Sequence, residues 1–196
     1  MTQAKRTIRK VRMGLICTGS NVDSAWGSPL ETTQNCFEVL EAKLNTRIKR
    51  SQSYASAAYP DGSGPDFVNA AGAFETDLPA DEILKVLHEV EAEADRVREV
   101  RWGPRTLDVD LIGLADVVLP DMDIWRYWAD LPANRQMVET PSDVVLPHPR
   151  VQDRAFALVP LCDVAPDWVH PVLGKSLVAL RDALDPREIN AITPAD

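Results

Sequence analysis

The chain has few cysteines and no long apolar run. Both absences limit the classes of protein to which it can belong. Only three cysteines, Cys17, Cys36 and Cys162, occur among 196 residues, and none belongs to a C-x-x-C pair. This number and spacing argue against a disulfide framework and against a zinc site. No stretch approaches the roughly 20 apolar residues that a bilayer crossing requires. We therefore expect reduced and mostly buried thiols, a cytoplasmic location and no membrane partner.

Positive charge is also scarce, because 21 basic residues stand against 30 acidic ones and the net charge is -9. Binding to a nucleic-acid backbone generally needs an extended positive surface, so nucleic acid is not expected as a partner. Residues 1–12 are basic but lack the apolar stretch of a signal peptide, and they are expected to form an N-terminal tail. Nothing in the composition marks a second domain.

Against this trend, arginine gathers in one place. Four arginines fall within ten residues: Arg96, Arg98, Arg101 and Arg105. Two carboxylates, Asp108 and Asp110, follow at an i, i+2 spacing. If residues 106–112 form a strand, both carboxylates share one face, roughly 7 Å apart at their Cα atoms, while the intervening apolar residues enter the core.

Two carboxylates at this spacing repel one another unless a hard cation lies between them. Mg²⁺ suits carboxylate oxygens that are supplemented by water and substrate phosphate. A strand with one solvated acidic face is common, so the acidic pair alone does not decide the function. Arginine forms bidentate hydrogen bonds to phosphate oxygens, and the neighbouring cluster therefore favours a site for a metal-bound polyphosphate.

The periodicity of apolar residues predicts alternating strands and helices. Strands are expected at 13–18, 48–54, 67–76 and 106–112, and helices at 29–44 and 79–97, with a loop at 55–66 and a further helix at 176–184. The order strand, helix, strand, strand, helix, strand is that of an α+β ferredoxin-like fold, with an antiparallel sheet and helices packed on one of its faces.

The segment RWGPRTLDVDLI at 101–112 resembles the central motif of the 6-hydroxymethyl-7,8-dihydropterin pyrophosphokinases. Three other segments agree with that family in order and approximate spacing: GSN at 19–21, FVNAA at 67–71, and LPHPR at 146–150 followed by RAF at 154–156. The resemblance implies the same ferredoxin-like architecture with a helical C-terminal extension. We expect one domain at 13–184, a C-terminal tail at 185–196, and a monomer.

The resemblance also implies a reaction and a set of site residues. The reaction transfers the β,γ-diphosphoryl group of ATP to the hydroxymethyl oxygen of the dihydropterin and releases AMP, as a step of folate biosynthesis. Asp108 and Asp110 are expected to hold two Mg²⁺ ions. The catalytic set is Arg96, Arg105, Asp108, Asp110 and Arg154. The residues expected to bind ATP are Arg98, Arg101, Trp102, His148 and Arg154. Those expected to bind the pterin are Ser56, Phe67, Asn69, Trp102 and Phe156.

Two regions depart from the family pattern. In the loop at 55–66, Ala57 and Ala58 lack the proline stiffness expected of the family, and Ser56 and Tyr59 stand where the family more often has threonine and proline. The pterin contacts of this loop are therefore not given by the resemblance alone. An insertion at about 116–147 carries the aromatic residues Trp125, Tyr127 and Trp128. These residues could pack as a small core, cover the nucleotide or form an interface, and packing is favoured because exposed aromatics promote aggregation. Glu91 is expected to orient arginines.

Other functions compete with this one. A metal-dependent nucleotidyltransferase also uses paired carboxylates on a strand, but it releases pyrophosphate. A ferredoxin-like RNA-binding module would need exposed aromatics and basic residues on its sheet without an acidic pair, which is the reverse of this pattern. A degenerate pyrophosphokinase would bind the pterin without turnover.

Overall fold

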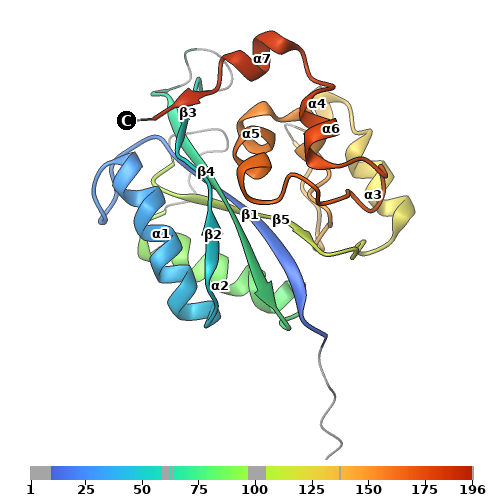
Figure 1. The fold of residues 1–196 in the computed structure, drawn as a ribbon, viewed down its shortest axis with the longest axis horizontal. Coiled ribbons are helices and arrows are strands. Elements are labelled where there is room, and N and C mark those ends of the chain that lie inside the picture. The colour runs from blue at the N-terminus through green and yellow to red at the C-terminus, as the bar shows by residue number, and fades with distance from the viewer. Residues whose placement is uncertain (1–9, 59–61, 63, 97–104, 137, 196) are drawn as a thin grey trace, which may run out of the picture.

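The computed structural model describes residues 10–58, 62, 64–96, 105–136 and 138–195 (Figure 1). The strands are β1 (Arg12–Ser20), β2 (Ile48–Arg50), β3 (Tyr54–Ser56), β4 (Phe67–Thr76), β5 (Asp108–Leu114) and β6 (Thr193–Pro194). The α-helices are α1 (Pro29–Leu44), α2 (Ala80–Glu93), α3 (Met122–Ala129), α4 (Ala133–Gln136), α5 (Ala155–Val164), α6 (Leu177–Arg181) and α7 (Pro186–Asn190). A 3-10 turn at Val151–Asp153 precedes α5.

The strands form one antiparallel sheet in the order β5-β1-β4-β3-β6, with β2 also paired to β4. The long strands β1 and β4 lie at its centre and pair from Arg12 and Thr76 to Ser20 and Val68. Strand β5 lies at one edge. The predicted mixture of helices with an antiparallel sheet is therefore confirmed.

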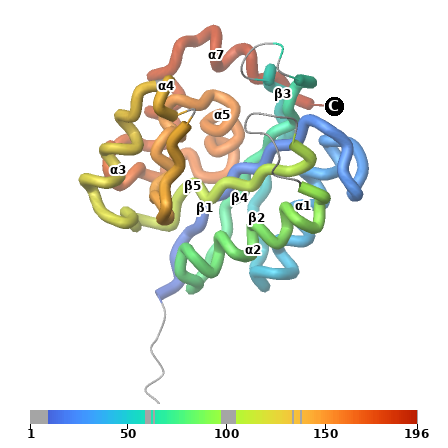
Figure 2. The backbone as a smooth tube through the Cα atoms, turned by 180° about the vertical axis from the view of Figure 1, so that it is seen from behind, coloured from blue at the N-terminus to red at the C-terminus, as the bar shows by residue number. Residues whose placement is uncertain are grey.

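Helices cover both faces of this sheet, because the side chains of β1 alternate between two buried clusters. Ile16 packs in a cluster with the apolar stripes of α1 and α2. Its neighbours Leu15 and Cys17 pack on the other face, against α5 and α6. Figures 1 and 2 show α1 and α2 on one side of the sheet and the C-terminal helices on the other. The expectation that helices cover one face alone was wrong, because α5 has its own apolar surface to bury.

The start of α1 follows from its local sequence. The Ser28 side chain accepts a hydrogen bond from the Glu31 backbone, the Glu31 carboxylate accepts one from the Ser28 backbone, and Pro29 occupies the first turn. This reciprocal pairing satisfies backbone donors that the first helical turn leaves free.

Helix α2 ends earlier than its periodicity predicted. It stops at Glu93 rather than near residue 97. Asp95 adopts the left-handed conformation, with φ 56°, and the Arg96 N–H donates to the Glu91 carbonyl at 3.1 Å. This is a Schellman-type end, which reverses the chain. Arg96 consequently lies beyond the helix.

Other boundaries also differ from the predictions. The single strand expected at 48–54 is divided into β2 and β3, and β3 extends into the expected loop at 55–66. The expected C-terminal tail contains α7 and β6, and β6 pairs with β3. No helix in the described part of the chain combines the length and apolar character needed to cross a membrane.

The insertion at 116–147 contains α3 and α4 and is closed by an antiparallel bridge between Leu119 and Leu146. Trp125 of α3 is buried, as the packing hypothesis required, whereas Tyr127 is exposed and stacks edge to face on Trp128. Packing therefore explains Trp125 but not the outer pair of rings.

Candidate functional site

The acidic pair lies on edge strand β5 with the alternation that the sequence predicted. Leu107, Val109 and Leu111 are buried against the α1 and α2 layer. Asp108 and Asp110 point to the opposite face and retain 22% and 41% side-chain exposure. This is the face on which α5 packs, and Asp110 lies near the start of that helix.

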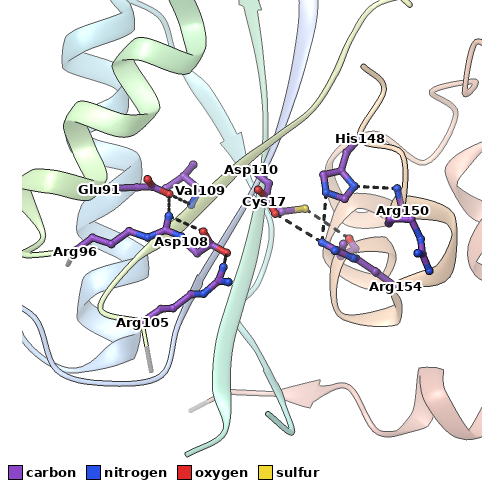
Figure 3. Close-up of polar contacts among 11 residues, drawn as sticks. Cys17, Glu91, Arg96, Arg105, Asp108, Val109, Asp110, His148, Arg150 and Arg154 are labelled. Atoms are coloured by element: carbon purple, nitrogen blue, oxygen red, sulfur yellow. Dashed lines mark hydrogen bonds and ion pairs between the residues drawn. The ribbon is translucent and has the colours of Figure 1, made fainter. Parts of the chain in front are cut away.

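Asp108 is held by two arginines (Figure 3). Arg96 Nη1 lies 2.6 Å from Asp108 Oδ1, and Arg105 Nη1 contacts Asp108 Oδ2. The buried carboxylate of Glu91 accepts hydrogen bonds from Arg96 and, at 2.9 Å, from the backbone N–H of Val109. Glu91 thus satisfies a free backbone donor of the edge strand and fixes Arg96 at the same time. Its expected role of orienting an arginine agrees with this geometry.

The pKa of Asp108 is raised above its ordinary value. Burial contributes most and repulsion by Asp110 contributes next, and together they outweigh the opposing effects of Arg105 and Arg96. The pair is therefore a place where negative charge is costly and where a further cation would be favourable.

Asn21 fixes the backbone beneath Arg105. The Arg105 N–H donates to Asn21 Oδ1 at 2.8 Å, and the Asn21 N–H donates to the Arg105 carbonyl at 3.1 Å. Asn21 belongs to a segment that resembled the family, but the sequence did not indicate this contact. Asn21 follows β1 and Arg105 precedes β5, so the two residues meet only because these strands lie side by side.

Asp110 faces a second basic group on the other side (Figure 3). Arg154, which directly precedes α5, places Nη1 3.8 Å from Asp110 Oδ2 and 3.5 Å from His148 Nε2. The His148 N–H donates at 2.8 Å to the carbonyl of Ile112. Ile112 is the extra residue of a β-bulge where the β1–β5 register shifts, and a bulge of this kind redirects a strand locally.

His148 is neutral in this setting. Burial lowers the pKa of its imidazole well below the ordinary value, and the charges of Arg154 and Arg150 lower it further. Nδ1 accepts a hydrogen bond from the Arg150 N–H at 3.1 Å, so the ring proton is assigned to Nε2. His148 Nε2 and Arg154 Nη1 are then two neighbouring N–H donors. One anionic oxygen could accept a hydrogen bond from both.

Four of the residues expected to bind the pterin lie on β3, β4 and α5: Ser56, Phe67, Asn69 and Phe156. Asn69 is buried, and its Nδ2 donates to Ser56 Oγ at 2.9 Å and to the Tyr54 carbonyl at 3.4 Å. Gly19 lies beside it, and a Cβ there would stand 3.2 Å from Asn69 Oδ1 and 3.6 Å from the ring of Phe67. Phe156 is 37% exposed and lies under the Arg154 guanidinium. Among the described residues, no ring contact joins Phe67 to Phe156.

A cleft of about 730 Å³ runs beside β5. Both acidic residues, Arg96, Arg105 and His148 line it, together with the exposed His88 of α2. Its remaining lining comes partly from the insertion, through Thr140, Val144, Val145 and Leu146. Of these four residues only Leu146 lies in a segment that resembled the family, so the sequence did not indicate that Thr140, Val144 and Val145 line the cleft. Arg98, Arg101 and Trp102 lie outside the described residues.

The donor set fits a magnesium ion that a phosphate ligand completes. Within the described residues, no group of three or more histidine, cysteine, aspartate or glutamate side chains is arranged to hold a metal. Mg²⁺ is commonly bound by one or two carboxylates, with waters and substrate phosphates as its other ligands. Asp108 and Asp110 supply those carboxylates.

Comparison with known proteins gave consistent results. The family model described as 7,8-dihydro-6-hydroxymethylpterin-pyrophosphokinase (HPPK) matches residues 15–166. The 2-amino-4-hydroxy-6-hydroxymethyldihydropteridine pyrophosphokinase of Pseudomonas aeruginosa is 34% identical over 157 residues, which are 80% of this chain and 82% of that protein. The enzyme of the same name from Methylorubrum extorquens is 32% identical over 175 residues, or 89% of this chain and 94% of that protein.

A solved structure of Plasmodium falciparum HPPK-DHPS has a similar fold. It superposes with a TM-score of 0.60 at 13% identity, and the match covers 90% of this chain and 45% of that one. The chain thus spans less than half of that longer protein, and at this identity the likeness concerns the fold alone.

Proposed function

The chain belongs to the 7,8-dihydro-6-hydroxymethylpterin-pyrophosphokinase family, and from this premise we propose how its site performs the reaction. The enzyme transfers the β,γ-diphosphoryl group of ATP to the hydroxymethyl oxygen of 6-hydroxymethyl-7,8-dihydropterin, giving the pterin diphosphate and AMP. The observation that carries the proposal for the site is the acidic pair of β5, which lines a cleft. Asp108 contacts Arg96 and Arg105 on one side, and Asp110 faces Arg154 on the other.

Asp108 and Asp110 are the proposed ligands of two magnesium ions. When bound, the ions would neutralise charge on the phosphate oxygens and favour ionisation of the attacking alcohol. Once Asp108 binds metal, Arg96 and Arg105 would turn from its carboxylate toward the phosphates, because a guanidinium uses the same N–H donors for a carboxylate and for a phosphate. Glu91, which also contacts Arg96 Nη1, would keep the guanidinium at the cleft when it leaves Asp108.

His148 and Arg154 are proposed to bind a phosphate oxygen from the other side. Because His148 is neutral, it donates a hydrogen bond without adding charge, and Arg154 supplies the charge. Transfers of this class depend on placement and on charge stabilisation more than on covalent chemistry by the protein. No general base is required in this scheme.

For the pterin, we propose a pocket formed by Phe67, Asn69 and Phe156. Both amide hydrogens of Asn69 are directed at β3, so Ser56 fixes the amide and Oδ1 remains as the acceptor for a ligand. Gly19 leaves space beside that oxygen, because no side chain intervenes. Arg98, Arg101 and Trp102 are proposed to complete the site.

Several wider features remain part of the proposal. The sheet order with α1 and α2 on one face supports a ferredoxin-like core, to which α5, α6 and α7 add a C-terminal extension. We also propose a cytoplasmic monomer with a single domain, which extends past the expected end at residue 184 because β6 pairs with the sheet.

Phosphorus NMR tests the reaction directly. The protein is mixed with Mg²⁺, ATP and 6-hydroxymethyl-7,8-dihydropterin, and the adenine nucleotide is identified as it forms. AMP together with a pterin diphosphate is the expected outcome. Free pyrophosphate would indicate nucleotidyl transfer, and pterin binding without turnover would indicate a degenerate enzyme.

A further inference from the structure

Three buried aromatic rings join the two ends of the insertion. Trp125 comes from α3, whereas Trp168 and His170 come from the segment between α5 and α6. His170 is fully buried, and its ring centroid lies 5.3 Å from that of Trp125 and 5.7 Å from that of Trp168, each at an interplanar angle of 66°. We call Trp125, His170 and Trp168 the ring bracket.

Each tryptophan of the ring bracket donates a hydrogen bond to one end of the insertion. Trp168 Nε1 donates to the carbonyl of Ala115, just after β5, at 3.1 Å. Trp125 Nε1 donates to the carbonyl of Pro147 at 2.8 Å, and this bond is buried. Pro147 immediately precedes His148, so the second bond fixes the peptide that leads into the cleft.

His170 has no role in the chemistry described above, yet its position is closely defined. Its Nδ1 accepts from the backbone N–H groups of Leu173, at 3.2 Å, and Val172, at 3.3 Å. In the described part of the chain, Nε2 has no hydrogen-bond partner and is buried. A neutral ring is held between two indoles, which is the arrangement of a spacer rather than of an acid or base.

The backbone that leads up to His148 is fixed at three points. Leu146 pairs with Leu119 through bonds of 2.9 and 3.1 Å, Pro147 is held by Trp125, and the His148 N–H is held by Ile112. A side chain that must meet a phosphate oxygen within hydrogen-bonding distance gains from a backbone that cannot shift, because small displacements weaken such contacts steeply.

We propose that the ring bracket is a positioning device for the nucleotide site, in which Trp125 acts through Pro147 to place His148 against the phosphates of ATP. The inference rests on the proposed function of His148 and extends it, because it gives the insertion a part in the reaction. Trp125 is a positioning residue and does not touch the substrate.

Trp125→Phe tests the proposal, because it keeps an aromatic ring against His170 and removes the N–H donor. Loss of one buried hydrogen bond predicts about a three- to tenfold rise in the KM for ATP. The KM for the pterin should stay within twofold of the parent value, about the scatter expected of independent sites. Tyr127→Phe on the same helix is the matched control and should leave both constants unchanged.

A double variant separates positioning from general loosening of the fold. His148→Ala alone should raise the KM for ATP, and Trp125→Phe added to it should produce no further rise, since both changes remove the same contact. An undiminished effect of Trp125→Phe in the His148→Ala background would overturn the proposal, as would equal rises in both KM values. Trp168→Phe, which removes the bond to Ala115, provides the same comparison should Trp125→Phe not accumulate as folded protein.

These experiments distinguish failure of the positioning role from failure of the proposed function. If the parent protein forms no AMP, the proposed function is rejected. If it forms AMP while Trp125→Phe and Trp168→Phe behave like Tyr127→Phe, only the positioning role is rejected.

Discussion

Asp108 combines two properties that usually exclude one another in a folded protein. Its carboxylate contacts two arginines, yet its pKa is raised, because burial and Asp110 outweigh that pairing. The ionised side chain therefore lowers the stability of the folded protein, and the same negative charge attracts cations to the site. Trade-offs of this kind are common where function requires an unfavourable local charge.

Asp108→Asn is expected to separate activity from stability. Turnover should fall at least about a hundredfold, as is typical when a charge-stabilising group at a reacting phosphate is removed. The melting temperature at neutral pH should not fall, because the ionised carboxylate is the unfavourable form. Any stability gained should vanish below the ordinary Asp pKa of 3.8, where the parent side chain is protonated in both states.

Asp123→Asn on the exposed start of α3 is a suitable control, because that side chain is 95% exposed. It should change neither turnover nor melting temperature. If Asp108→Asn retained more than about a tenth of the parent turnover, its role as a metal ligand would be untenable.

At the scale of elements, the C-terminal strand supports a distant pocket. Strand β6 pairs with β3 through Thr193 and Ala55, and the Ala195 N–H donates to the Ser53 carbonyl at 2.9 Å. Strand β3 in turn presents Ser56 to Asn69. Without β6, β3 would become an exposed edge of only three residues, and short edge strands are held weakly.

A truncation that ends at Asn190 should therefore weaken pterin binding selectively. The KM for the pterin is expected to rise about three- to tenfold, equivalent to the loss of one well-placed hydrogen bond. The KM for ATP should be unchanged, because Asp108, Asp110 and His148 lie toward the opposite edge. Steady-state kinetics with each substrate varied in turn measure both constants.

Thr193→Ala is the matched control, because pairing of β6 uses its backbone and this change leaves the backbone intact. It should behave like the parent protein. Equal rises in both KM values for the truncated protein would show that β6 stabilises the whole fold and has no selective effect on the pocket.

At the scale of the whole molecule, the sheet joins two apolar layers, and the layer that contains α5 also encloses a buried histidine. Burial lowers the pKa of His170 from 6.5 to about 4. The unfolded chain consequently binds a proton between these values that the folded chain does not. Stability is fully present above the ordinary pKa and is lost as the pH falls toward the lowered one.

This difference predicts acid sensitivity. Between pH 7.5 and pH 5, His170 should remove about 2 kcal/mol from the free energy of unfolding. His148 acts in the same direction, whereas Asp108, whose pKa is raised, acts in the opposite direction. Urea unfolding at the two pH values measures the change, and His170→Gln should reduce it.

His88→Gln controls for a general effect of losing a histidine, because the His88 side chain is exposed on α2. Its unfolding should keep the parent pH dependence. If His170→Gln kept that dependence as well, the acid sensitivity would have to arise from other groups.

Much of the fold was predictable wherever a local rule decides the outcome. The bounds of α1 and β4 agree with the prediction, because a capping box starts the helix and a run of apolar residues fills the central strand. The faces of β5 were predictable for the same reason, since alternation along a strand is a property of the backbone itself. The resemblance to the family rested on side chains within one short segment.

Other features depended on partners that are distant in the sequence. The early end of α2 was missed, because it depends on a left-handed residue that is not a glycine, Asp95. The second layer of helices was missed, because it depends on which surface of the sheet α5 covers. The bulge at Ile112, the Asn21 contact and the ring bracket likewise join segments that local patterns cannot relate.

The sequence by itself determined the chemistry that this protein can perform: two carboxylates at an i, i+2 spacing, a cluster of arginines and the motif that carries the family resemblance. Only the tertiary structure decided how those groups are held. It assigned Arg96 and Arg105 to Asp108 and Arg154 to Asp110, and it made the insertion a wall of the cleft. The physical reason is that charge and periodicity are properties of neighbouring residues, whereas burial and pairing arise only when the sheet brings distant segments together.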